Sequence, residues 1–159
     1  MPMHDASHPP MLARLLGYSG LIPFVSGALC VWLAPQAMQA PIMTALLNYT
    51  AIILAFMGAI HWGLAMAVGT VRDDSITGAP LQLGLSVIPA LIGWTAVSFG
   101  LPATFALPVL LLAFIGLYLA DLRAIALGLA PPWYRALRLP LTLIVTLSLL
   151  TAWAGALAG

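Results

Sequence analysis

Three ionisable side chains lie inside otherwise apolar runs, and they have the clearest capacity for chemistry in this sequence. His61 sits late in residues 49–71, a run without Asp, Glu, Lys or Arg, while Asp121 and Arg123 sit late in residues 103–129. An imidazole and a carboxylate in such surroundings can relay a proton or bind a polar group, and lipid offers them no partner. We therefore expect His61 and Asp121 to face the protein interior and to pair, with Arg123 able to join them.

Each of these residues also has a purely structural interpretation. A neutral His61 could hydrogen bond to a backbone carbonyl and hold two helices together. Asp121 and Arg123 could lie at a helix end near the headgroups, with the arginine extending to water. A structure that holds His61 and Asp121 far apart would contradict the pairing.

Signatures of enzymes and cofactor sites are missing from the sequence. It has no HExxH pattern, no glycine-rich phosphate loop and no paired carboxylates within an apolar run. The single cysteine, Cys30, excludes an intramolecular disulfide. We therefore expect no enzymatic activity, no metal and no cofactor.

The composition is that of an integral membrane protein. Of 159 residues, 63% are hydrophobic and 6% are charged, and the mean hydropathy is +1.10. Soluble domains carry about 25% charged residues, so this chain could not cover an aqueous surface. The charged residues are five Arg and four Asp, which provide no basic patch for nucleic acid.

Apolar runs of membrane-spanning length predict an all-α fold, a polytopic bundle of five transmembrane helices. A polar, proline-rich tail at residues 1–11 is expected to be disordered, and residues 12–159 are expected to form a single domain. The predicted spans are residues 12–34, 44–71, 81–100, 103–129 and 137–158.

The arginines predict the orientation of these spans. With five spans, all five Arg fall on the side of the N-terminus, so the N-terminus is expected in the cytoplasm and the C-terminus outside. At the entry to the last span lie residues typical of an interfacial anchor: Trp133, Tyr134, Arg135 and Arg138.

Small residues and prolines predict how the helices pack. A row of small residues at every fourth position of the second span predicts a close helix contact; its members are Ala51, Ala55, Ala59, Gly63 and Ala67. Pro23 and Pro89 are expected to kink the first and third spans.

Two short patterns occur twice in the same order. Residues 22–27 and 88–93 both read Ile-Pro-x-x-x-Gly, and residues 54–58 and 112–116 both read Leu-Ala-Phe-x-Gly. The matches indicate either a parallel two-helix repeat followed by a fifth helix, a design known among transporters, or chance similarity within a small apolar alphabet.

Several stretches resemble a known family. Residues 16–24 (LGYSGLIPF), residues 58–63 (GAIHWG) and residues 131–142 (PPWYRALRLPLT) resemble the bacterial domain-of-unknown-function 3429 family, which is similar to mitochondrial transmembrane protein 69. The resemblance covers about residues 12–151 and implies a small polytopic protein of the bacterial inner (plasma) membrane. The resemblance assigns no catalytic residue. It marks residues 61–63 and 131–142 as positions that the chain shares with the family pattern.

Two functional hypotheses follow. The first is an accessory subunit or assembly factor of a larger membrane complex, for example a respiratory one, with a membrane-protein partner or a second copy of the chain. The alternative is a small transporter or channel that uses His61 and Asp121. A water-lined cavity reaching His61 would favour the transporter, and a dry interior would favour the interaction hypothesis.

Overall fold

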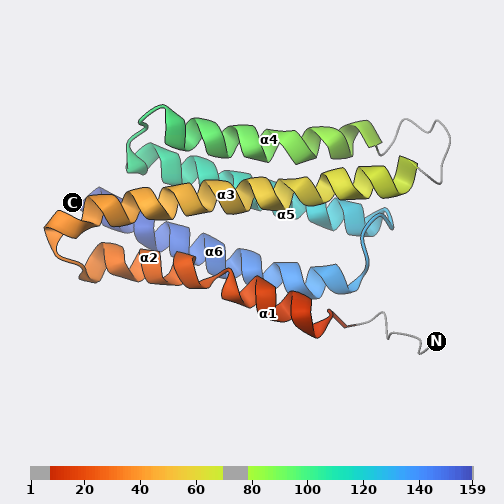
Figure 1. The fold of residues 1–159 in the computed structure, drawn as a ribbon, viewed down its shortest axis with the longest axis horizontal. Helices are drawn as coiled ribbons and strands as arrows, with labels where there is room; N and C mark the ends of the chain where they lie inside the picture. Colours follow the sequence, from red (N-terminus) through yellow and green to blue (C-terminus); the bar gives the residue numbers. More distant parts are fainter. Residues whose placement is uncertain (1–7, 70–78, 159) are drawn as a thin grey trace.

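The fold of this protein, taken from a computed structural model that describes residues 8–69 and 79–158, is entirely helical within those residues (Figure 1). The helices are α1 (Met11–Ser19), α2 (Ile22–Leu33), α3 (Gln36–Gly69), α4 (Ala79–Ser98), α5 (Ala103–Ala126) and α6 (Trp133–Ala158). Five helical units, with α1 and α2 together as one, are long and apolar enough to cross a membrane. The predicted all-α bundle with five spans is confirmed. Most of the tail expected to be disordered, and most of the polar loop after residue 71, lie outside the described residues.

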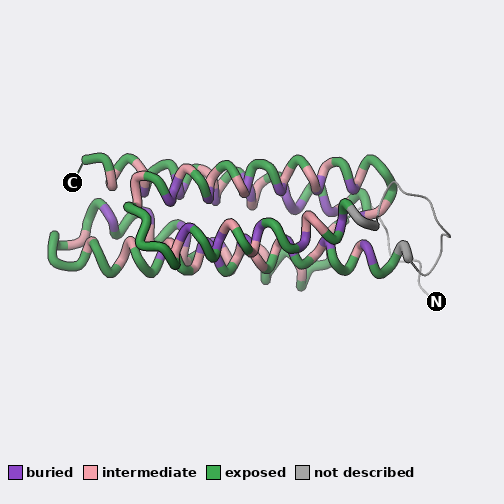
Figure 2. The backbone as a smooth tube through the Cα atoms, turned by 90° about the horizontal axis from the view of Figure 1, so that it is seen from above, coloured by how far each residue is buried: buried purple, intermediate pink, exposed green. Residues whose placement is uncertain are grey.

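The helices run along a common axis (Figure 1). α1 begins at one end of the bundle, and α6 ends at the other. α3 packs most extensively on α4 and also contacts α2 and α5, while α6 packs on α5 and α2. Buried positions face the centre and exposed positions cover the outside (Figure 2). Large apolar side chains fill the centre, among them Phe24, Leu54, Leu107, Phe114 and Leu149.

Three helix ends differ from the predicted boundaries by three residues or more, and each lies beside a proline or a glycine. α3 begins at Gln36 instead of residue 44 and includes Pro41 in its second turn. A membrane helix tolerates such a proline, so Pro41 does not mark the start of the helix. α6 begins at Trp133 instead of residue 137, directly after two prolines that suit a helix start. α5 ends at Ala126 instead of residue 129, since Gly128 adopts a positive φ of 71°. The amides of Leu129 and Gly128 then donate to the carbonyls of Ala124 and Ile125, which closes the helix in a Schellman motif.

The two prolines expected to kink their helices have different surroundings. At Pro23 the first span is interrupted, because α1 ends at Ser19 and α2 begins at Ile22. The Tyr49 hydroxyl of α3 donates to the Gly20 carbonyl at this break over 2.9 Å, so the exposed backbone oxygen is satisfied within the protein. Pro89 lies inside α4, which continues through it.

The small-residue row on α3 does not stay on one face of the helix. Ala51 is buried and Ala55 partly buried, whereas Ala59, Gly63 and Ala67 are exposed. A residue four positions on is rotated by about 40° around an α-helix, so a row of five drifts by about 160°. Its beginning therefore faces α4, and its end faces away from the bundle.

Two glycines lie at close contacts between α3 and α4. A Cβ added to Gly93 would lie 3.0 Å from the Ala51 carbonyl oxygen, and one added to Gly58 would lie 3.0 Å from the Ser86 carbonyl oxygen and 3.1 Å from Pro89 Cγ. Backbone atoms cannot yield as a flexible side chain can. These glycines allow the two helix backbones to approach closely.

The repeated sequence patterns occupy different environments. Gly58 is packed against α4, but its counterpart Gly116 is exposed, and a Cβ added to it would meet nothing within 4 Å. Gly27 packs on Leu46 of α3, and its counterpart Gly93 also packs on α3, instead of on the helix that would correspond to it in a two-helix repeat. The matching residues thus do not make matching contacts.

We predict that Gly58→Ala destabilises the protein by about 1–3 kcal/mol, because the added methyl group overpacks the α3–α4 contact. The matched control is Gly63→Ala on the same helix, where a Cβ meets nothing within 4 Å. The control should be neutral or slightly stabilising, since alanine favours a helix over glycine. Unfolding of both variants in mixed micelles measures the difference, and equal stability would show that the contact tolerates a side chain.

Candidate functional site

Four buried polar side chains from four different helices meet in the interior of the bundle. His61 comes from α3, Gln82 from α4, Asp121 from α5 and Arg138 from α6. Their exposed fractions are 0%, 2%, 1% and 3%, respectively. This polar cluster contains the ion pairs that Asp121 forms with His61 and with Arg138, and it connects the four longest helices.

Asp121 is the centre of the cluster because each of its oxygens faces a different partner. Arg138 Nε donates to Asp121 Oδ2 over 2.5 Å, and His61 Nε2 lies 3.1 Å from Asp121 Oδ1. This second contact lacks hydrogen-bond geometry, and neither His61 Nε2 nor Asp121 Oδ1 has a hydrogen-bond partner among the described residues. On its other side, the His61 ring contacts Gln82 Oε1 through Nδ1. The pairing expected for His61 and Asp121 is therefore present as a contact.

The hydrogen bonds of the cluster depend on where one proton and one amide group lie. As placed, both ring nitrogens of His61 face oxygen atoms, so both contacts are satisfied only when the ring is an imidazolium with two N–H groups. If the Gln82 amide is turned over, its NH₂ group donates to Nδ1 and a neutral His61 donates from Nε2 to Asp121. The cluster can thus accept one proton when the amide of Gln82 reverses.

The aspartate–arginine pair keeps the cluster electrically tolerable in an apolar interior. An isolated charge at this depth is expensive, whereas the carboxylate and the guanidinium neutralise each other across a single hydrogen bond. A neutral His61 adds no net charge to this pair. The arrangement can hold helices together, and it can hold a proton, without needing water inside the bundle.

Two of the sequence-predicted residues lie elsewhere than expected. Arg123 is exposed and does not join His61 and Asp121, since it lies two residues from Asp121 and so on another side of α5. Arg138, expected at the membrane interface, is the arginine that occupies the cluster. Of the other expected anchor residues, Arg135 is exposed, Trp133 is partly buried and Tyr134 is buried.

Arg138 could have been found from the symmetry of a helical hairpin. In an antiparallel pair, residues equally far from the turn lie at the same height. Asp121 lies five residues before the end of α5 at Ala126, and Arg138 lies five residues after the start of α6 at Trp133, so the rule places these two side chains in register. It does not find Gln82, which lies three residues after the start of α4, whereas His61 lies eight residues before the end of α3.

Besides His61 Nε2 and Asp121 Oδ1, three buried polar atoms in or beside the cluster have no hydrogen-bond partner among the described residues. They are the Tyr134 hydroxyl, Arg138 Nη2 and the Thr142 hydroxyl, and all three belong to α6. Their positions, four residues apart, form one row along α6 that passes through the cluster at Arg138. Buried polar groups are nearly always satisfied, so this row indicates room for a further hydrogen-bonding group.

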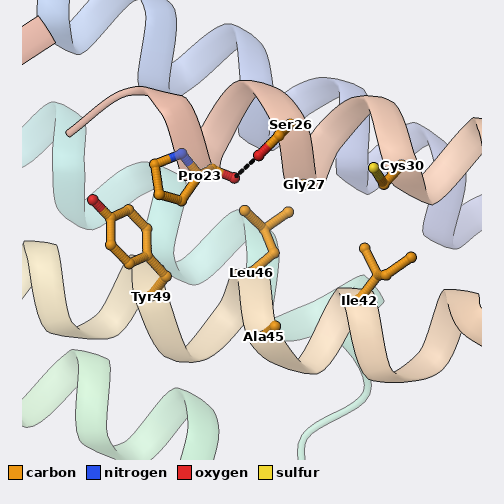
Figure 3. A pocket seen from close by; sticks show the side chains of 8 residues that line it. All are labelled: Pro23, Ser26, Gly27, Cys30, Ile42, Ala45, Leu46 and Tyr49. Atoms are coloured by element: carbon orange, nitrogen blue, oxygen red, sulfur yellow. Dashed lines mark hydrogen bonds between the residues drawn. The ribbon is translucent and has the colours of Figure 1, made fainter. Parts of the chain in front are cut away.

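A surface groove between α2 and α3 is separate from the cluster. It has a volume of about 400 Å³, and Figure 3 shows Pro23, Cys30, Ile42, Leu46 and Tyr49 around it. The residues that line it do not include His61 or Asp121. Within the described residues there is also no group of three metal-binding side chains.

A five-span helical bundle with a buried ion-paired cluster defines this chain as a polytopic α-helical membrane protein. More particularly, the chain belongs to the family described as "Protein of unknown function (DUF3429)", whose model matches residues 9–154. The resemblance noted in the sequence is thereby confirmed.

Two relatives carry the name transmembrane protein 69. The protein from Xenopus tropicalis is 34% identical over 140 residues, which is 88% of this chain and 53% of the relative. The protein from Mus musculus is 28% identical over 141 residues, 87% of this chain and 54% of the relative. The chain therefore spans about half the length of these relatives. No solved structure matches it.

We predict that Asp121→Asn lowers the free energy of unfolding by about 3–5 kcal/mol, because it leaves Arg138 buried without its counter-ion. Arg138→Met should cost a similar amount by stranding the carboxylate. The double variant Asp121→Leu/Arg138→Met, which leaves no unpaired charge, should recover most of the loss.

Arg123→Met is the matched control for Arg138→Met, since Arg123 is exposed, and it should change stability by less than about 0.5 kcal/mol. Unfolding of all four variants in mixed micelles completes the comparison. If the double variant loses as much free energy of unfolding as the two single variants together, the ion pair is not the cause of their instability.

Proposed function

We propose that this protein acts by interaction: it is an accessory subunit or assembly factor that docks laterally on another membrane protein. The observation that carries the proposal is that the C-terminal part of the small-residue row on α3 is exposed on the outside of the bundle. Ala59 and Gly63 are exposed, and a Cβ at Gly63 would meet nothing within 4 Å. Small residues on a membrane-facing surface let a second helix approach closely, and lipid provides no other force that favours them there.

The burial of the cluster supports the same proposal. His61 is fully buried and Asp121 is 1% exposed, and both contact polar side chains of the protein. A rigid bundle tied together through its centre is well suited to present a fixed outer surface. The interaction does not require the cluster to open to water.

A transporter or channel is the second candidate function, and the buried cluster itself favours it. Ionisable side chains within membrane spans often belong to ion or proton pathways, and this cluster has a position for one mobile proton. This function requires a conformation in which His61 reaches water from at least one side.

The proposed location is a bacterial inner membrane, with the N-terminus in the cytoplasm and the C-terminus outside. The start of α1, the end of α5 and the start of α6 lie at the same end of the bundle (Figure 1). These segments carry Arg14, Arg123, Arg135 and Arg138, and this concentration of arginine at one end supports the orientation.

We predict that the protein extracted at its native level into lipid nanodiscs carries a stoichiometric membrane-protein partner, identified by mass spectrometry. Gly63→Leu should abolish the association, because a large side chain keeps the second helix at a distance. Gly116→Leu is the matched control: Gly116 is also exposed and open but lies on α5, and this variant should retain the partner.

A lone monomer would contradict the accessory-subunit proposal, and a homo-oligomer broken by Gly63→Leu would assign the surface to a second copy. Ion or proton flux through reconstituted vesicles that is lost in both His61→Ala and Asp121→Asn would favour the transporter instead.

We also predict that a reporter active only outside the cytoplasm is active when fused after Ala158 and inactive when fused before Met11. The asymmetric arginines retain the N-terminal end on the cytoplasmic side. The reverse pattern of activity would overturn the orientation.

A further inference from the structure

A second cavity lies beside the polar cluster, where α1, α2, α3, α5 and α6 meet. Its volume is about 110 Å³, larger than one water molecule needs and close to what a single six-membered ring occupies. It lies at the interruption between α1 and α2, where Gly17 and Gly20 line it.

The cavity is apolar except at one wall. Phe24, Phe56 and Phe114 bring aromatic rings from three helices, whereas α6 contributes Arg138 and Thr142. These two polar residues are 3% and 5% exposed, and Arg138 Nη2 and the Thr142 hydroxyl lack a partner among the described residues. An apolar pocket with a few convergent polar groups is the usual form of a small-molecule site.

We propose that this cavity binds a membrane-soluble molecule with a neutral carbonyl-bearing ring as its head group. Arg138 Nη2–H is a donor and the Thr142 hydroxyl can donate, so a head group that accepts hydrogen bonds satisfies both. Asp121 already neutralises the charge of Arg138 through Nε, which removes the need for an anion. The aromatic lining and the volume fit a flat ring, such as that of a quinone.

The same surroundings provide a path from the bilayer. Leu16 and Phe56 line the cavity and are 64% and 66% exposed on the outer surface of the bundle. A ring seated against α6 can therefore leave its hydrocarbon tail between these side chains, in lipid. This site lies beyond the proposed docking surface, which is formed by Ala59 and Gly63, and it needs no partner protein.

The test measures binding of a decyl-substituted benzoquinone to the full chain in phosphatidylcholine nanodiscs, after subtraction of its partition into protein-free nanodiscs. We expect saturable binding of one molecule per chain. Decylbenzene has the same ring size and tail without carbonyl groups and should bind at least about tenfold more weakly. Decanoate, which offers a carboxylate, should also bind more weakly.

Two variants of α6 distinguish recognition from simple filling of space. Thr142→Val keeps the shape but removes the hydroxyl, and we expect it to weaken quinone binding roughly threefold to tenfold. The matched control is Thr146→Val, one turn further along, because the Thr146 hydroxyl bonds to the Thr142 carbonyl and does not line the cavity. Thr142→Ser, which retains a hydroxyl, should bind the quinone nearly as well as the unaltered protein.

Several outcomes would overturn the site. These are an absence of saturable binding, equal affinity for decylbenzene, tighter binding of decanoate, or equal effects of Thr142→Val and Thr146→Val. None of them depends on whether a partner protein is captured, so this proposal and the proposed function can fail separately.

Discussion

The buried pair of Asp121 and Arg138 is the interaction on which the rest of this structure depends. Each charge alone would be unfavourable in an apolar interior, and each is acceptable because the other lies within hydrogen-bond distance. The pair fixes the height of α5 against α6, and His61 and Gln82 extend the same connection to α3 and α4. Apolar packing within a membrane is poorly specific, so this polar cluster is what distinguishes one register of the helices from others.

Much of the fold can be predicted because hydrophobic length is a strong signal. The five spans and the paired His61 and Asp121 follow from where apolar runs and ionisable residues occur. The helix ends are harder to predict: Pro41 resembles a breaker but lies inside α3, and only the positive φ of Gly128 ends α5 before residue 129. The first span is broken before Pro23 and not merely kinked: Pro23 has no amide to donate to the carbonyl four residues before it, and α2 begins at Ile22, after α1 has ended at Ser19.

The site is less predictable, because it depends on which helices are neighbours. Arg123 is close to Asp121 in sequence but faces another direction, whereas Arg138 is distant in sequence and lies opposite across a hairpin. Gln82 is uncharged and draws no notice in the sequence, although a buried amide is what the second nitrogen of His61 needs. Family membership supports the membrane fold and assigns no role to these residues.

The tight turn between α5 and α6 has a consequence for how the protein enters the membrane during synthesis. α5 leaves the ribosome first and carries a carboxylate whose insertion on a single helix costs about 2.5–3.5 kcal/mol. The closed Schellman turn keeps the following helix close, so Arg138 arrives within a short stretch of newly made chain. The two helices therefore form a natural unit of insertion: a hairpin that crosses the bilayer with its charges already matched, before the first three spans have to close around it.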